Sequence, residues 1–357
     1  MLYRCLSNVA RNFRFYAAQL SSAAPFANIP DRSDANTTVI NAASNVVIAT
    51  VSAGGGPRGV VFNPAGTHAY VANNASDNVS VIDTVTHRVV ATVALGALTF
   101  PIGVAVNPAG TCAYVVNNGS NNVSVIDTAS NTVVATIAVA YKPFGVAFNP
   151  AGTRAYVTNS ISKSVSVINT ATHTVVATVA VGSDPYSVAV NPAGTRVYVA
   201  NNVSDDVSVI DTATNAVLAS VTVGTHPYGV AIHPTGARAY ITNRGSDNVS
   251  VIDTATHAVI ANVAAGVGPR GIALNLTGTR AYVANGVSNN VSIIDTATNT
   301  VIATVAAGTS PRGIDVNATG TRVYVANFAD NNITVIATAS NTVVAAVAAG
   351  TNPPSSA

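Results

Sequence analysis

The feature of this sequence that most constrains its fold is a short phrase, Tyr-Val/Ile-X-Asn, that returns at nearly constant spacing. Its tyrosines occupy seven positions: Tyr70, Tyr114, Tyr156, Tyr198, Tyr240, Tyr282 and Tyr324. The first interval is 44 residues and each of the following five is 42. A chain that repeats itself at such a period folds as an array of similar units, each packed against its neighbours.

Each repeat has room for four short strands, which we name A to D in chain order. In the unit that begins at Pro185, the residue pattern predicts strands over 187–191, 196–201, 207–211 and 216–223, bounded by turn residues. Strand D is almost wholly apolar or small, which predicts a sheet buried on both faces. Four-stranded units of about 40 to 45 residues, repeated four to eight times, are typical of a β-propeller.

The composition agrees with sheets that pack face to face. Only 8% of the residues are charged, there is no Glu, and 48% are hydrophobic. This is the reverse of a disordered sequence, and no apolar run reaches the roughly 20 residues of a membrane-spanning helix. We therefore expect an all-β, seven-bladed β-propeller of four-stranded antiparallel blades that does not span a membrane.

One repeat contains the tetrapeptide Tyr156-Val157-Thr158-Asn159, and on this motif the chain resembles the YVTN β-propeller repeat family from about residue 36 to 350. The resemblance implies a seven-bladed ring in proteins that are frequently surface-layer or otherwise extracytoplasmic. We accordingly expect a periplasmic or cell-surface location. The resemblance implies a function only loosely, because a fold does not determine a function.

The sequence divides into four segments. Residues 1–35 precede the repeats and lack the clean apolar stretch of a secretory signal, so we expect a targeting segment or a disordered extension. Residues 36–53 look like an extra C–D strand pair with no A and B before them, residues 54–350 form the propeller, and 351–357 form a tail. The extra pair closes the ring, caps it or is surplus to it. We favour closure or capping, because an exposed sheet edge promotes unwanted pairing.

Loops from every blade of a propeller meet at the mouth of its central channel, where binding sites concentrate. The residue after the Pro that begins strand A lies at this mouth in each unit, and the seven positions are Arg58, Ile102, Phe144, Tyr186, Tyr228, Arg270 and Arg312. If the last blade lies beside the first, the three arginines are contiguous and the three aromatic residues form the opposite arc. We hypothesise that they bind an anionic or aromatic small ligand. The alternative is that they only fill the channel.

The residue before that Pro forms a second ring, in which Lys142, Asp184 and His226 fall on successive blades. An acid and a base on one rim suit proton transfer, so Asp184 and His226 are candidate catalytic residues. Solvated rim charges are the alternative interpretation. On this balance we expect a non-catalytic binding or scaffold protein that acts through one ring face on a small ligand or a partner protein.

Two other functions stay open. An enzyme like the lactonase or lyase propellers, which the chain distantly resembles, would carry its chemistry at the mouth near His226. A single-stranded nucleic-acid binder would use the aromatic residues and arginines of the mouth. Residues 36–357 carry twelve basic and twelve acidic side chains, and a neutral body argues against nucleic acid. We expect a monomer.

The remaining polar residues read as structural. Arg196, Arg238 and Arg280 each stand 15 residues before an Asp that ends strand C, a spacing that predicts cross-strand ion pairs. His87, His173 and His257 occupy C–D turns on separate blades, and no ladder of Asp residues offers the six to eight oxygens that calcium binds. We therefore expect no metal site and no cofactor.

Overall fold

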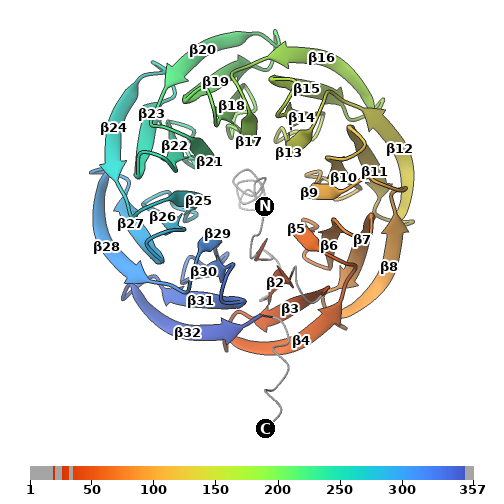
Figure 1. The fold of residues 1–357 in the computed structure, drawn as a ribbon, viewed down its shortest axis with the longest axis horizontal. Helices are drawn as coiled ribbons and strands as arrows, with labels where there is room; N and C mark the ends of the chain where they lie inside the picture. The colour runs from red at the N-terminus through yellow and green to blue at the C-terminus, as the bar shows by residue number, and fades with distance from the viewer. Residues whose placement is uncertain (1–18, 21–25, 32–34, 350–357) are drawn as a thin grey trace.

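The structure, a computed structural model, describes residues 19–20, 26–31 and 35–349, which contain 32 β-strands. The strands form eight four-stranded sheets that stand radially round a common axis (Figure 1). Seven sheets correspond to the seven repeats, so the predicted all-β, seven-bladed propeller of antiparallel four-stranded blades with an extra N-terminal strand pair is confirmed. None of the described residues lies in a helix of the length and hydropathy that crossing a bilayer requires.

The strands of the seven repeats have closely similar bounds. The A strands, innermost in the ring, are β5 (Pro57–Phe62), β9 (Pro101–Val106), β13 (Pro143–Phe148), β17 (Pro185–Val190), β21 (Pro227–Ile232), β25 (Pro269–Leu274) and β29 (Pro311–Val316). The B strands are β6 (His68–Asn73), β10 (Cys112–Asn117), β14 (Arg154–Asn159), β18 (Arg196–Asn201), β22 (Arg238–Asn243), β26 (Arg280–Asn285) and β30 (Arg322–Asn327).

The outer half of each blade is equally regular. The C strands are β7 (Asn78–Asp83), β11 (Asn122–Asp127), β15 (Ser164–Asn169), β19 (Asp206–Asp211), β23 (Asn248–Asp253), β27 (Asn290–Asp295) and β31 (Asn332–Ala337). The D strands are β8 (Arg88–Ala94), β12 (Thr132–Ala138), β16 (Thr174–Ala180), β20 (Val217–Thr222), β24 (Val259–Ala264), β28 (Thr300–Ala306) and β32 (Thr342–Ala348).

The hydrophobic core lies between neighbouring sheets. Each cluster of buried residues joins two of them, as where Tyr156 and Val165 of one blade pack with Val188 and Val197 of the next. The seven repeat tyrosines of the B strands are at most 1% exposed. Packing of sheet on sheet therefore explains why the chain has so few charged residues, because most of each B and C strand is shielded from water.

The expectation that strand D is buried on both faces is wrong. Most of its residues are exposed or partly buried and one in each strand is buried, as in β20, where Leu218 is 48% exposed and Val221 7%. The physical reason is the radial arrangement: neighbouring sheets diverge toward the circumference, so the outermost strand has less surface to pack against. Strands B and C lie nearer the axis, and they are buried as the apolar pattern had predicted for strand D.

The extra N-terminal pair belongs to an eighth sheet. It consists of β3 (Asn36–Asn41) and β4 (Val46–Ser52), and β2 (Phe26–Asp31) and the short β1 (Gln19–Leu20) extend it inward. This sheet lies between the last blade and the first (Figure 1). It thus closes the ring without displacing β32, which keeps its pairing with β31. Most of the predicted extension, residues 1–35, and the tail, 351–357, lie outside the described residues.

Packing ties this sheet to both neighbours. Ile40 is buried with Tyr324 and Val335 of the last blade, while Val39 is buried with Val60 of the first. The Tyr324 hydroxyl donates to the carbonyl of Ala42 across the seam, at 3.0 Å.

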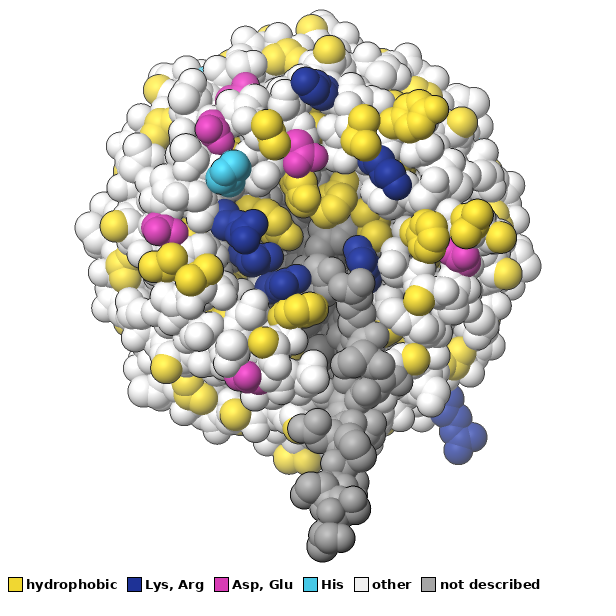
Figure 2. All heavy atoms as spheres, viewed as in Figure 1, with side chains coloured by type: hydrophobic (Ala, Val, Ile, Leu, Met, Phe, Trp, Pro, Cys, Tyr) yellow, Lys and Arg dark blue, Asp and Glu magenta, His cyan; other side chains and the backbone are white. Residues whose placement is uncertain are grey.

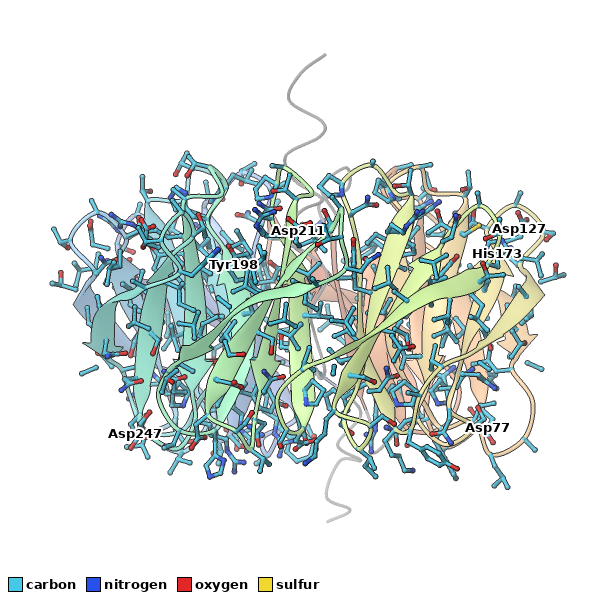
Figure 3. The ribbon with its side chains drawn as sticks, turned by 90° about the horizontal axis from the view of Figure 1, so that it is seen from above. Asp77, Asp127, His173, Tyr198, Asp211 and Asp247 are labelled. Carbon is cyan, nitrogen blue, oxygen red and sulfur yellow. The ribbon has the colours of Figure 1, made fainter. Side chains whose placement is uncertain are left out.

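The ring has two distinct faces. The B–C loops and the connections from strand D to the next strand A form one, which we call the mouth face; the A–B and C–D turns form the other, the turn face. Figure 3 shows Asp77 and Asp247 along the edge of the mouth face, with Asp127, His173 and Asp211 along the opposite edge. Residues of the two faces therefore cannot meet in one site.

Candidate functional site at the channel mouth

The backbone places the second ring of predicted residues. All seven residues that precede the Pro of strand A have a left-handed φ, including Lys142 at 54°, Asp184 at 56° and His226 at 52°. In five blades the N–H of this residue donates to an Asp or Asn of the preceding B–C loop, as His226 does to Asp205 at 2.8 Å. The carboxylates of Asp77, Asp205 and Asp247 thus help to hold the connection that enters the next blade.

The predicted aromatic residues form a continuous arc. The ring centroids of Phe144 and Tyr186 lie 4.2 Å apart, and those of Tyr186 and Tyr228 lie 5.5 Å apart. The Arg270 guanidinium continues the arc, 5.9 Å from the centroid of Tyr228. The arc thus presents ring faces and one cation side by side, a combination suited to a flat or anionic ligand. Ile102, at the same position in its blade, is 2% exposed and belongs to the core.

Arg270 is the central cation of the mouth. Burial lowers its pKa, and the neighbouring cations Arg312 and Arg244 lower it further, while Tyr228 raises it. A guanidinium stays protonated at neutral pH in spite of such shifts. Its Nε is buried without a hydrogen-bond partner among the described residues. A buried, charged donor surrounded by like charges is the arrangement that an anionic ligand would relieve.

The sequence did not single out Arg244, which the structure places in this cluster. It begins the B–C loop of its blade, where other blades carry Asn74, Asn118 or Asn202. Those asparagines donate to the carbonyl of the next blade's Pro, as Asn202 does to Pro227 at 3.0 Å. The signal was available in the sequence: Arg244 is the only charged residue at this position of the repeat, where four of the seven blades carry Asn or Ser.

In the next blade, Gly286 occupies the position of Arg244 and leaves space for the Arg270 side chain. A Cβ at Gly286 would lie 2.9 Å from the Arg270 Nε and 3.1 Å from the carbonyl oxygen of Pro311. A larger residue there would displace the guanidinium.

The three predicted arginines are not contiguous. Arg270 and Arg312 lie on neighbouring blades, but the N-terminal sheet separates Arg312 from Arg58. The prediction assumed that the last blade lies beside the first, and the eighth sheet invalidates that assumption. Arg312 instead stacks on Phe328 of its own blade, with its Cζ 3.6 Å from the ring centroid.

The candidate acid and base differ in their surroundings. Asp184 is half-buried, and burial raises the pKa of its carboxyl group. His226 is exposed, and its Nδ1 lies 3.2 Å from the carbonyl oxygen of Asn202. Because a carbonyl oxygen only accepts, Nδ1 carries the proton and Nε2 of the neutral ring is left as an acceptor. Among the described residues, no hydrogen bond or ion pair joins Lys142, Asp184 and His226 to one another.

Figure 2 shows the mouth face, hollowed at its centre, with Lys and Arg side chains, hydrophobic side chains and a histidine gathered round the hollow. His226 belongs to this region, since its backbone carbonyl accepts from the N–H of Arg244 at 3.0 Å and its ring lies against Gly245. The mouth thus combines a proton acceptor, cations and aromatic surfaces.

The other polar residues are structural. Arg196, Arg238 and Arg280 lie opposite their aspartates in register, and two of the three form ion pairs, Arg196 with Asp211 at 2.6 Å and Arg280 with Asp295. The three predicted turn histidines all have a left-handed φ. No group of three or more His, Cys, Asp or Glu side chains within the described ranges is arranged to hold a metal ion.

The chain matches the family model described as "Lactonase, 7-bladed beta-propeller" over residues 33–168 and 146–305. No curated protein matches it. This family match contradicts our expectation of a non-catalytic binding or scaffold protein and favours the enzyme alternative. The expectation failed because it took the polar residues of the rim for solvated charges, and a position on the rim does not by itself argue against catalysis.

Several solved structures share the fold. Hydrazine synthase of Kuenenia stuttgartiensis has 23% identity and a TM-score of 0.66, covering 92% of this chain and 97% of that chain. Dihydro-heme d1 dehydrogenase NirN, in complex with DHE, has 16% identity and a TM-score of 0.75, covering 92% and 74%. A functionally unknown protein from Desulfotomaculum acetoxidans DSM 771 has 15% identity and a TM-score of 0.66, covering 85% and 99%. At such identities the likeness establishes the fold alone.

Proposed function

Because this chain belongs to the lactonase family of seven-bladed β-propellers, we propose that it is a hydrolase that opens the ring of a lactone at the mouth face. The observation that carries the proposal is the pairing, at one rim, of a histidine whose Nε2 is left to accept a proton with a partly buried arginine cluster.

Lactone hydrolysis makes three demands on a site. A water molecule must lose a proton as its oxygen bonds to the carbonyl carbon, the negative charge that develops on the carbonyl oxygen must be stabilised, and the alkoxide released when the ring C–O bond breaks must gain a proton. The product is a hydroxy acid. The mouth has a candidate residue for each demand.

We assign the proton transfer to His226. Its Nδ1–H is held by the carbonyl of Asn202, so Nε2 can take the proton of the attacking water and return it to the leaving alkoxide. Asp184, whose pKa burial raises, is the second candidate for the base.

We assign substrate binding and charge stabilisation to the arginines and the aromatic arc. Arg270 has a buried donor to offer, with Arg244 and Arg312 as neighbouring cations. Phe144, Tyr186 and Tyr228 offer ring faces against which the body of a lactone would lie. The excess of positive charge favours a lactone that also carries a carboxylate or phosphate group. Arg58, beyond the N-terminal sheet, is a further candidate for binding that group.

The test is a steady-state assay of lactones of several ring sizes, neutral and anionic, followed by acid release. We expect His226→Gln to lower kcat by about 100-fold or more, the usual contribution of a general base, with little change in KM. Arg270→Gln should raise KM for anionic lactones about tenfold or more and leave KM for neutral lactones unchanged, while kcat falls for both because the arginine also stabilises the developing oxyanion. His257→Asn, a histidine of the turn face, is the matched control and should keep full activity.

The outcomes separate the assignments from the proposal itself. Full activity in His226→Gln would move the base to Asp184, and Asp184→Asn would then abolish the acidic limb of the pH profile. Absence of hydrolysis across the panel by the wild-type chain would refute lactone hydrolysis.

The resemblance to YVTN repeat proteins supports an extracytoplasmic location, which fractionation of the cells that produce the protein would test. Light scattering of the purified chain would test the expected monomeric state.

A further inference from the structure

A second hollow lies on the turn face, where the blade β21–β24 meets the blade β25–β28. It has a volume of about 390 Å³. The polar residues that line it are His233, Thr235, Arg238, Thr277, Thr279 and Thr296. Since these belong to A–B and C–D turns, the hollow is separate from the mouth.

The hollow exists because one turn departs from the repeat. In other blades an Asn begins the A–B turn and binds the backbone, as Asn191 accepts from the N–H groups of Thr195 and Arg196 at 2.8 and 2.9 Å. In this blade His233 replaces the Asn and Ala237 replaces the Thr.

The substitution changes how the two blades touch. At four other seams the turn glycine faces the turn proline of the preceding blade, as Gly194 faces Pro150. Here Gly278 faces the ring of His233, since a Cβ on Gly278 would lie 2.2 Å from Nε2. The imidazole ring therefore takes the place of the proline as the contact between the turns.

His233 forms a neutral wall of the hollow. Its Nδ1 accepts from the N–H of Thr235 at 3.2 Å and lies 2.7 Å from that residue's hydroxyl. Burial lowers its pKa, a backbone hydrogen bond with Gly278 raises it, and nearby Arg238 lowers it. The positive charge of the hollow therefore comes from Arg238.

Arg238 is set apart from its equivalents. Arg196 and Arg280 form ion pairs with the aspartates that face them, whereas the Arg238 guanidinium donates to the carbonyl of Thr296 in the next blade. Asp253, which faces Arg238 in register, accepts from the turn of its own blade, as Asp211 and Asp295 do. The hydrogen bonds of that turn lower the pKa of the Asp253 carboxyl group and the nearby Arg238 contributes to lowering it, but the two side chains form no ion pair. The carbonyl occupies one of five guanidinium N–H donors, and no carboxylate of the described residues neutralises the charge by an ion pair.

We propose that this hollow binds the phosphate or carboxylate group of a small organic molecule, with Arg238 as the charged donor and the threonine hydroxyls completing the hydrogen bonds. Its volume exceeds that of a bare ion and falls within the range of about 300 to 1,000 Å³ typical of ligand pockets. Ala237, Gly278 and Ala297 also line it and offer apolar contact for the body of the ligand.

The test is calorimetric titration of the full chain with inorganic phosphate, as the smallest probe of this chemistry. Because phosphate is also expected at the mouth, the titration uses an Arg270→Gln/Arg312→Gln background. We expect one saturable site to remain there. Arg238→Gln should weaken it about tenfold or more, the effect of losing a charge-assisted hydrogen bond. The matched control Arg280→Gln, at the same position of the next blade, should leave it unchanged.

A second variant does not depend on removing the charge. His233→Asn/Ala237→Thr restores the turn of the other blades, so it should close the hollow and abolish the site while keeping the melting temperature at or above that of the parent. Loss of all phosphate binding in the Arg270→Gln/Arg312→Gln background, or unchanged binding in either turn-face variant, would overturn the proposal.

Discussion

Replacement of Tyr324 by Phe tests the place of the N-terminal sheet in the ring. The Tyr324 hydroxyl donates to the carbonyl of Ala42 at 3.0 Å and lies 3.3 Å from the Asn45 side chain, and both belong to the N-terminal sheet or its turn. Tyr156 occupies the same position in another blade and is equally buried, but its hydroxyl has no partner among the described residues. Tyr156→Phe is therefore the matched control for Tyr324→Phe.

The expected magnitudes follow from these contacts. A net intramolecular hydrogen bond contributes about 1 kcal/mol, so Tyr324→Phe should lower the free energy of unfolding by about 1 kcal/mol. Tyr156→Phe removes a buried hydroxyl that gains nothing from its surroundings and should be neutral or slightly stabilising. In a chain of 357 residues, an unfolding entropy of about 2.1 cal/mol/K per residue converts 1 kcal/mol into a melting shift of only about 1.3 °C.

Urea denaturation is therefore the better assay, because it resolves the change in free energy directly. Tyr114→Phe is a positive control, since the Tyr114 hydroxyl lies 2.9 Å from the Nδ1 of His173. If Tyr324→Phe costs no more than Tyr156→Phe while Tyr114→Phe shows its loss, the N-terminal sheet does not occupy this place in solution.

Two further changes probe the mouth. Burial raises the pKa of Asp184, so protonation stabilises the fold: stability contributed by this group is present below its unfolded pKa and lost as pH rises through the folded one. Asp184→Asn should therefore raise the urea midpoint at pH 7 and have no effect near pH 3; an equal effect at both values would contradict burial as the cause. A Cβ at Gly271 would lie 2.3 Å from the carbonyl oxygen of Arg312, so Gly271→Ala should cost about 1 to 3 kcal/mol in urea and weaken anion binding at the mouth. Gly55→Ala, where the nearest contact is 3.6 Å, is its control and should change neither.

The strands of the blades could be predicted well because each repeat contains both the residues that form its strands and the turn residues that bound them. Tyr-Val-X-Asn marks strand B, and turn residues bound its neighbours, so the four strands predicted from Pro185 onward agree with β17 to β20 to within two residues. The N-terminal strand β2, Phe26–Asp31, was missed since it shares no phrase with the repeats. Its pairing with β3 depends on tertiary contacts, which no local sequence pattern indicates.

The arrangement of residues at the mouth could be predicted where it depends only on equivalent positions of the repeats. It could not be predicted where it depends on which blades lie side by side. Register alone puts Phe144, Tyr186 and Tyr228 on one rim, and their tilted rings do lie against one another in sequence order. The adjacency of Arg312 and Arg58 depended on how the ring closes, and one additional sheet cancels it. The orientation of His226 likewise depends on a carbonyl of the preceding blade, which periodicity cannot specify.

A ring of near-identical blades acquires a specific site only where one blade differs from the rest, because a residue repeated at every blade surrounds the axis evenly. The blade β21–β24 differs on both faces. At the mouth it contributes His226 and Arg244, and at the turn face it contributes His233 and the redirected Arg238. Both proposed sites therefore involve the same blade, and each uses side chains that the consensus of the repeats lacks. In a repeat protein of this kind, departures from the consensus are better guides to function than the motif that reveals the fold.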